Sequence, residues 1–272
     1  MTLTHRRAPA GGDGASLRRR DFLRGTGVAA LGACVPRPRE PAGPTGPTGP
    51  ASVPTGAAAR WPPFSAGVTI DAASGVNVVW PDDMVERLNA ARVVVDLAHG
   101  AQRTIHDGIA ASKAPALISH TGCRALSDLP RCTPDAELRM LADKGGVAGM
   151  IFWPYLRTDT QPMAIDLIRH IEHAIQVAGE DHVGLGSDTS VAPVDRAGTF
   201  EHDNRAMVAD MVDQGIFARG RPADLYMFLP DLNVADRYER IGALLSARGH
   251  SDARIAKILG GNFARVLREG WG

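Results

Sequence analysis

The chain has 272 residues, of which 44% are hydrophobic, and its 30 basic residues balance 30 acidic ones, so the formal net charge is zero. This length and apolar content allow one large domain or two small ones with a buried core. A nucleic-acid-binding protein needs an excess of basic residues to replace the counterions of the phosphates, so we exclude nucleic acid as a partner.

Residues 1–34 have the pattern of an export signal. The sequence Arg-Arg-Asp-Phe-Leu-Arg at residues 19–24 is close to the twin-arginine motif, and a short, mildly apolar run follows it. That run is too short to cross a bilayer as a mature helix. The sequence Leu-Gly-Ala-Cys at residues 31–34 is similar to a bacterial lipobox, in which Cys34 becomes lipidated; cleavage nearby with loss of Cys34 is the alternative. We therefore expect an exported protein, periplasmic or anchored to the membrane by a lipid.

Residues 35–60 have the composition of a flexible linker. They are rich in Pro, Gly, Ala and Thr, and residues 43–50 repeat the triplet Gly-Pro-Thr. Such a segment cannot bury enough apolar surface to offset the entropy lost on ordering. We interpret it as a tether between the export signal and a folded domain that starts at residue 61.

From residue 61 onward, short apolar runs alternate with amphipathic stretches, which indicates alternating strands and helices. The strands are continuously apolar, as in a parallel sheet buried on both faces. Four clear strand–helix units are half of the eight in a closed barrel, so the predicted fold class is α/β, a partial (β/α)8 TIM-barrel-like domain over residues 61–272. The expected strands are 93–97, 116–119, 147–152 and 183–186, with a weaker one near 67–70, and the expected helices are 101–113, 134–144 (N-cap Thr133), 163–177, 204–213, 234–247, 251–259 and 262–269.

Three polar residues follow the predicted strands. His99 ends the first clear strand, His120 ends the second, and Asp188 follows the fourth. The carboxyl ends of parallel strands meet on one face, and neighbouring strands lie about 4.8 Å apart, so these side chains can meet at one metal ion. One histidine at a strand end is more often a structural residue. Two histidines on consecutive strands, with an aspartate on a later one, indicate a metal or acid–base site.

Two cysteines lie in the predicted domain, Cys123 and Cys132. Their spacing permits a disulfide in an oxidising compartment but does not require one. Two buried thiols are the alternative that we favour.

Several motifs in the predicted domain resemble those of one family when taken in chain order. They are Val-Val-Asp-Leu-Ala-His (94–99), Ser-Lys-Ala-Pro-Ala-Leu-Ile-Ser-His-Thr-Gly-Cys-Arg-Ala-Leu (112–126), Pro130-Arg131, Gly-Leu-Gly-Ser-Asp (184–188), Leu-Leu-Ser-Ala-Arg-Gly-His-Ser-Asp (244–252) and Lys-Ile-Leu-Gly-Gly-Asn-Phe (257–263). Together they resemble the membrane (renal) dipeptidase family, peptidase family M19, over about residues 78–269.

The resemblance implies a role for each predicted site residue. His99 and His120 stand where the family places ligands of the second zinc of a binuclear pair. Arg131 stands where the family holds the substrate's carboxylate, and Asp188 where an aspartate acts in proton transfer. Two zinc ions activate a bridging water, and the planar arginine side chain suits a free carboxylate. The implied function is an exported zinc dipeptidase that cleaves dipeptides or related small amides.

The sequence also departs from the family. The first zinc of the family is held by a His-x-Asp pair, and residues 61–98 contain no such pair; Asp71 is the nearest counterpart. The glutamate that bridges the two zinc ions in the family belongs to strands that we do not find in this sequence. Glu86 is expected to be a solvated helix residue and not this ligand. The alternative is therefore an N-terminally incomplete, catalytically inactive relative, or a small-ligand-binding protein that retains Arg131. Strand edges left unpaired would favour a homodimer.

Overall fold

The computed structural model describes residues 83–217 and 219–271, and all of these belong to one compact unit. The predicted export signal, the predicted linker and the weak strand near residues 67–70 lie outside the described residues. Within the described ranges, no helix is both long enough and apolar enough to cross a membrane.

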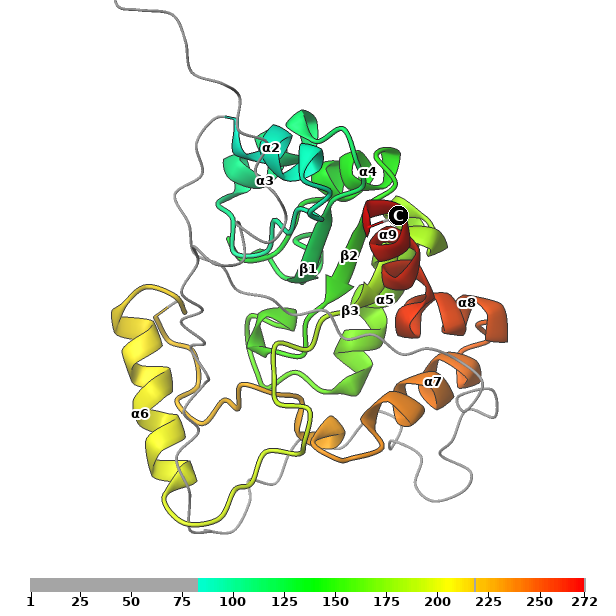
Figure 1. Ribbon diagram of the computed structural model, residues 1–272. Helices are drawn as coiled ribbons and strands as arrows, with labels where there is room; N and C mark the ends of the chain where they lie inside the picture. The colour runs from blue at the N-terminus through cyan, green and yellow to red at the C-terminus, as the bar shows by residue number, and fades with distance from the viewer. Residues whose placement is uncertain (1–82, 218, 272) are drawn as a thin grey trace, which may run out of the picture. The chain divides into compact units, whose positions relative to one another are not determined.

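A parallel sheet of three strands forms the centre of the described fold (Figure 1). The strands β1 (Leu117–Thr121), β2 (Val147–Met150) and β3 (Val183–Leu185) are adjacent in chain order, and every residue in them is buried. The continuously apolar runs in the sequence predicted this arrangement, because helices that connect parallel strands cover the sheet. The mixed α/β fold class is confirmed.

The first predicted strand is much shorter than expected. It reduces to an isolated parallel bridge between Asp96 and Leu117, with backbone hydrogen bonds of 2.8 Å from Leu117 N to Val95 O and from Leu97 N to Leu117 O. Beyond that point the Asp96 carboxylate, rather than a backbone carbonyl, accepts the N–H of Ser119 at 2.9 Å. The side chain thus takes the place of the next bond of the ladder, and the segment leaves the sheet.

Helices precede, connect and follow the strands, as expected for β/α units (Figure 1). Helix α3 precedes β1, α4 and α5 connect the strands, and α6 follows β3. The helices are α2 (Met84–Ala90), α3 (Gln102–Ala111), α4 (Asp135–Asp143), α5 (Ala164–Ala178), α6 (Phe200–Asp213), α7 (Arg237–Ala247), α8 (Asp252–Ala256) and α9 (Asn262–Trp271), with 3-10 turns at Pro154–Leu156, Glu180–His182 and Pro230–Leu232 and a π-helical turn at Lys257–Gly261.

Two helix starts differ from the predictions. Helix α4 takes Pro134 as its N-cap residue, and Thr133, which we expected to cap it, hydrogen-bonds with its hydroxyl to that of Thr121 at 2.8 Å. Helix α6 starts four residues earlier than expected, at Phe200, which is buried and packs against the ring of Phe228. In both cases a tertiary contact of the residue decides where the helix starts, and the local sequence does not show that contact.

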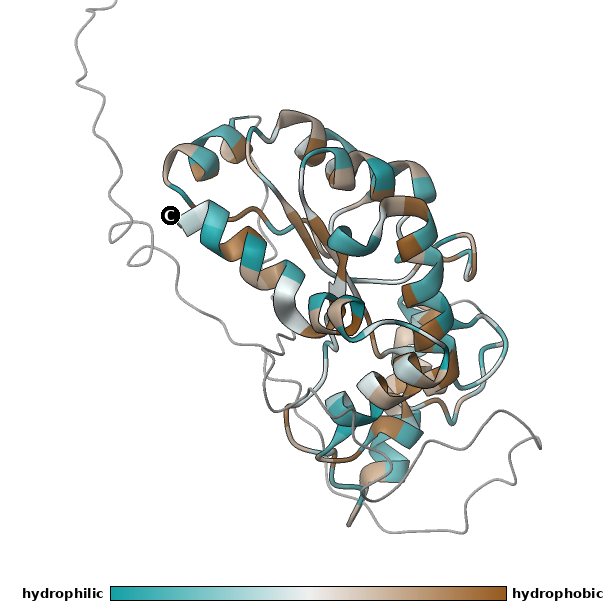
Figure 2. Cartoon of the chain, turned by 90° about the vertical axis from the view of Figure 1, so that its right-hand side faces the viewer, coloured by the Kyte–Doolittle hydropathy of each residue, from teal (hydrophilic) through white to brown (hydrophobic). Residues whose placement is uncertain are grey.

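Helix α9 packs against the sheet through its apolar residues. Phe263 and Val266 are fully buried and form a cluster with Leu117 of β1 and Val147 of β2. Figure 2 shows that α9, which ends at the label C, carries hydrophilic as well as hydrophobic residues. Gly184 in β3 makes the close approach possible, because a Cβ atom there would lie 2.4 Å from the ring of Phe263. Helix α9 therefore packs against residues of all three strands.

Candidate metal centre

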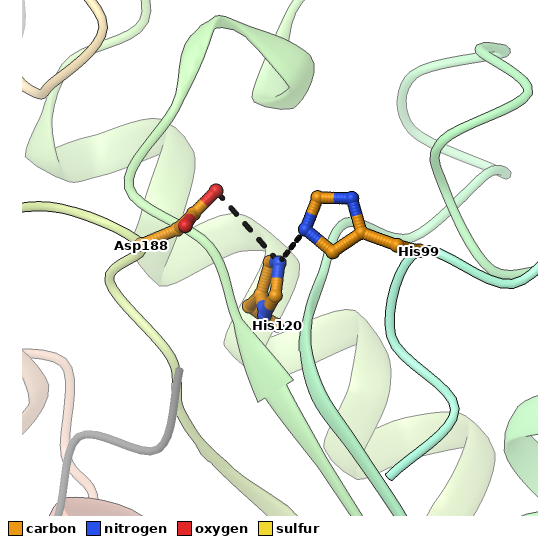
Figure 3. A group of neighbouring side chains, drawn as sticks. All are labelled: His99, His120 and Asp188. Atoms are coloured by element: carbon orange, nitrogen blue, oxygen red, sulfur yellow. Dashed lines mark hydrogen bonds and ion pairs between the residues drawn. The ribbon is translucent and has the colours of Figure 1, made fainter. Parts of the chain in front are cut away.

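The side chains of His99 and His120 meet at the carboxyl end of β1 (Figure 3). His120 lies in β1 and is buried, with 1% of its surface exposed, whereas His99 is exposed and has a left-handed backbone with φ of 64°. Their Nε2 atoms are 2.8 Å apart, and their rings cross at 65°. The two imidazoles therefore direct nitrogen atoms at the same point.

Asp188 approaches His120 from the side opposite to His99 (Figure 3). It lies three residues beyond the end of β3, and its φ of 52° is also left-handed. Its Oδ2 atom is 3.7 Å from His120 Nε2, and one ligand atom from each of the three residues lies within 4.8 Å of the others. The structure thus brings together the three residues that we selected from their places at strand ends.

Both histidines are held in the neutral form. Burial, the positive charge of Arg131 and the proximity of His99 together lower the pKa of His120 to about 3, and burial contributes most. Partial removal from water and Arg131 also lower the pKa of His99, against an opposing effect of Asp96. The ring of His120 is oriented by a 2.9 Å contact between its Nδ1 and the hydroxyl of Ser119. Neutral imidazole is the form that binds metal ions.

The site fits a zinc ion. The two imidazole nitrogens can bind it, and the Asp188 carboxylate lies close enough either to complete the ligand set or to exchange a proton with a bound water. The contact between His99 Nε2 and His120 Nε2 requires a proton on one nitrogen, and an ion bound to both would replace that proton. Within the part of the chain that the structure describes, this is the group of His, Cys, Asp and Glu residues that can hold a metal ion.

Arg131 lies beside the three residues. Its Nη1 donates to the carbonyl oxygen of His120 at 3.4 Å, and its buried Nη2 has no hydrogen-bond partner among the described residues. Its guanidinium lies over the ring of Tyr155, 5.9 Å from the centroid. Burial lowers the pKa of Arg131, but Tyr155 and Asp188 oppose this, and arginine remains charged in proteins. The site therefore holds a cation with an N–H group available to an anionic ligand.

Two aromatic residues of the site escaped our sequence analysis. Trp153 donates its indole N–H to the carbonyl oxygen of Asp188 at 2.5 Å, and its ring stacks on that of Tyr155 at 5.9 Å between centroids and an angle of 9°. Trp153 directly follows the predicted strand 147–152, so its place at a strand end was the available signal. Indole is neither a metal ligand nor a titratable group, so a pattern of such groups at strand ends does not include Trp153.

The cysteines of the domain are free and buried, which supports the thiol alternative. Cys123 Sγ lies 3.4 Å from the carbonyl oxygen of His170, and Cys132 Sγ lies 3.4 Å from that of Tyr155. Burial raises the pKa of Cys132 to about 11 and that of Cys123 further still. Both thiols are therefore protonated and serve in packing.

A parallel β/α sheet with two histidines and an aspartate at its carboxyl edge defines the chain as a protein of the metal-dependent hydrolase type. The family to which it belongs follows from its sequence. Residues 70–208, just over half of the chain, match the membrane dipeptidase family (peptidase family M19). The chain is a member of peptidase family M19.

Individual relatives agree with this assignment. The dipeptidase tcpJ of Claviceps purpurea is 28% identical over 190 residues, which are 69% of this chain and 37% of that protein. An uncharacterized dipeptidase of Schizosaccharomyces pombe, C965.12, is 36% identical over 114 residues, 41% of this chain and 27% of that protein. The chain therefore spans less than half the length of these curated relatives.

Solved structures show the same fold. An amidohydrolase from Pseudomonas aeruginosa superposes with a TM-score of 0.56 at 26% identity, over 70% of this chain and 56% of that one. A metallopeptidase from Rhodobacter sphaeroides, liganded with a phosphinate mimic of the dipeptide L-Ala-D-Ala, superposes with a TM-score of 0.53 at 21% identity, over 70% and 46%. The fold of the described residues is thus that of part of a TIM-barrel-like hydrolase.

Proposed function

We propose that the protein is a zinc-dependent, dipeptidase-like hydrolase that cleaves dipeptides or related small amides. The observation that carries the proposal is the convergence of His99 Nε2 and His120 Nε2, 2.8 Å apart, with the carboxylate of Asp188 beside them. The membership of family M19 and the dipeptidases among the relatives give the same direction.

Each residue of the site has a part in the proposed reaction. His99 and His120 would hold zinc, which lowers the pKa of a bound water to about 7 and so supplies a nucleophile at neutral pH. Water oxygen bonds to the carbonyl carbon, and the bond from that carbon to the amide nitrogen breaks. Asp188 takes the proton that the water loses and passes it to the leaving nitrogen. Its position 3.7 Å from His120 Nε2 supports this role.

Arg131 would select the substrate by its carboxylate. The buried Nη2 without a partner and the neighbouring Nη1 can donate two parallel hydrogen bonds to a carboxylate. A substrate held by its terminal carboxylate presents the amide bond one residue away. Dipeptides with a free carboxyl end would therefore be cleaved in preference to the same dipeptides with an amidated end.

One observation favours a second function, that of a catalytically inactive relative that binds small carboxylates through Arg131. The His-x-Asp pair that holds the first zinc of the family has no counterpart in residues 61–98. Glu86, the one glutamate in residues 61–98, is exposed in α2 and pairs with Lys113 at 3.1 Å, so it does not serve as the glutamate that bridges the two zinc ions in the family. Two zinc ions per chain would support the enzyme, and one or none would support the inactive relative.

We also propose that the protein is exported. The twin-arginine motif at residues 19–24 supports export, and the Leu-Gly-Ala-Cys sequence that ends at Cys34 supports a lipid anchor in the membrane. We further propose that two copies associate through unpaired strand edges as a homodimer.

Hydrolysis of a dipeptide panel tests the proposed function. The full chain is loaded with Zn2+, and release of free amino acid is followed for dipeptides with L- and D-residues at the second position. We expect turnover that a chelator abolishes and added zinc restores, and we expect no turnover of the same dipeptides with an amidated carboxyl end. A zinc-loaded protein that cleaves none of the panel would favour the inactive relative.

A further inference from the structure

The backbone at Asp188 has an unusual conformation, and its carbonyl oxygen accepts a hydrogen bond from a side chain that lies beyond the end of β2. The β2–β3 ladder continues past the strands through the bonds from Gly186 N to Met150 O (3.0 Å) and from Phe152 N to Ser187 O (3.3 Å). The next residue, Asp188, turns away with φ of 52°, a region that residues other than glycine seldom adopt.

The indole of Trp153 donates a hydrogen bond to the backbone just beyond this ladder. Trp153 follows Phe152 directly, and its Nε1 donates to the carbonyl oxygen of Asp188 at 2.5 Å. Its ring is itself held, because it stacks on the buried Tyr155 at an angle of 9°. Arg131 contacts the same pair of rings, because its guanidinium lies over Tyr155, 5.9 Å from the centroid of that ring. The two rings thus connect the arginine and the aspartate of the site through a chain of contacts.

We propose that Trp153 is a positioning residue for Asp188: its indole N–H fixes the left-handed turn and thereby aims the carboxylate at the point where His99 and His120 meet. The inference rests on the proposed hydrolase function, because it assigns to Trp153 an effect on proton transfer and not on binding. Trp153 supplies none of the ligand atoms, and its effect on the site passes through its hydrogen bond to Asp188. Misplacement of a reacting group by about 1 Å can cost about 100-fold in rate.

The variant Trp153→Phe tests the proposal, since it keeps an aromatic ring and removes the N–H. Trp271→Phe is the matched control, because Trp271 is half exposed at the end of α9. In the zinc-loaded full chain we expect kcat of Trp153→Phe to fall about 10- to 100-fold with KM changed less than about twofold and zinc content retained. A role in stability alone would instead lower zinc content and the midpoint of unfolding. Wild-type kcat in Trp153→Phe would overturn the proposal.

Exchange of the indole hydrogens gives a readout that needs no activity. In 15N-labelled protein, Trp153→Phe assigns the indole signal of Trp153, and we expect this N–H to exchange with solvent much more slowly than the indole N–H of free tryptophan. Exchange as fast as that of free tryptophan would overturn the proposal, because the hydrogen bond to Asp188 would then be absent. If the wild-type chain cleaved no dipeptide, the proposed function would fail, and the exchange rates would still decide whether Trp153 holds Asp188.

Discussion

The Nε2 atoms of His99 and His120 lie 2.8 Å apart, although 21 residues separate the two histidines in the chain. One ring stands on an exposed left-handed turn and the other on a buried strand, so they meet only because that turn and β1 lie side by side. The bridge between Asp96 and Leu117, together with the bond from the Asp96 carboxylate to Ser119, holds the two segments in this register. The pairing of these two segments therefore brings the two imidazole rings together.

Arg131→Ala should weaken substrate binding and leave the metal in place. Hydrogen bonds between charged groups contribute about 1.5–3 kcal/mol, so we expect KM for a dipeptide to rise about 10- to 100-fold with zinc content unchanged. Arg131→Lys should restore only part of the binding, because lysine lacks the planar fork.

A dipeptide with an amidated carboxyl end gives the control for Arg131. Wild type and Arg131→Ala should handle this amide equally poorly, since the partner of the guanidinium is missing in both cases. If Arg131→Ala weakened binding of the amide as much as that of the free dipeptide, carboxylate capture would be the wrong role for Arg131.

His170 should make the protein less stable in acid. Burial lowers the pKa of His170 to about 4, although the bond from its Nε2 to Leu156 O at 3.0 Å raises it. Its Nδ1 accepts the N–H of Cys123 at 2.9 Å, which requires the neutral ring. Between pH 6.5 and 4 the unfolded chain binds the proton and the folded chain does not, so this stability is complete above pH 6.5 and is lost as the pH falls toward 4. The loss should reach about 3 kcal/mol.

Urea unfolding at several pH values between 7.5 and 4 measures this effect. His170→Gln should be less stable than wild type at pH 7.5, because it loses a buried hydrogen bond, but its stability should fall less steeply with acid. Parallel curves for the two proteins would show that other groups cause the acid sensitivity.

Gly184→Ala should destabilise the fold by crowding α9. A Cβ atom at this position would lie 2.4 Å from the ring of Phe263, and overpacking of a core costs about 1–3 kcal/mol. A second change, Phe263→Leu, removes the ring and should make the cost of Gly184→Ala smaller than in the wild-type background. Thermal unfolding of the four proteins checks the coupling, and strictly additive effects would contradict the packing of α9 on β3.

The proposed export signal predicts that changing its two arginines changes the compartment in which the protein is found. Arg19→Lys combined with Arg20→Lys should leave the protein in the cytoplasm, since the twin-arginine pair is the recognised element of such signals. If Cys34 is lipidated, Cys34→Ala should release the exported protein from the membrane fraction. Unchanged delivery of the double lysine variant, seen by cell fractionation, would rule out this route.

The sheet and the site residues could be predicted largely from the sequence, whereas the contacts that shape the site could not. Continuous apolar runs gave β1, β2 and β3 within a few residues, and the strand ends pointed to His99 and His120. The short first strand depends on one side-chain bond of Asp96, and the left-handed turn at Asp188 is stabilised by a tryptophan from β2's carboxyl end. Such tertiary bonds leave no periodic pattern in the sequence.

Zinc affinity of the histidine variants tests the central claim most directly. His99→Ala and His120→Ala are compared with His106→Ala, which removes an exposed histidine of α3, by competition with a chelator. Loss of an outer-shell partner alone costs about 10- to 100-fold in metal affinity, so each of the first two variants should lose at least about 100-fold, while His106→Ala should bind as wild type does. Equal zinc affinity in all three variants would contradict a metal centre at His99 and His120.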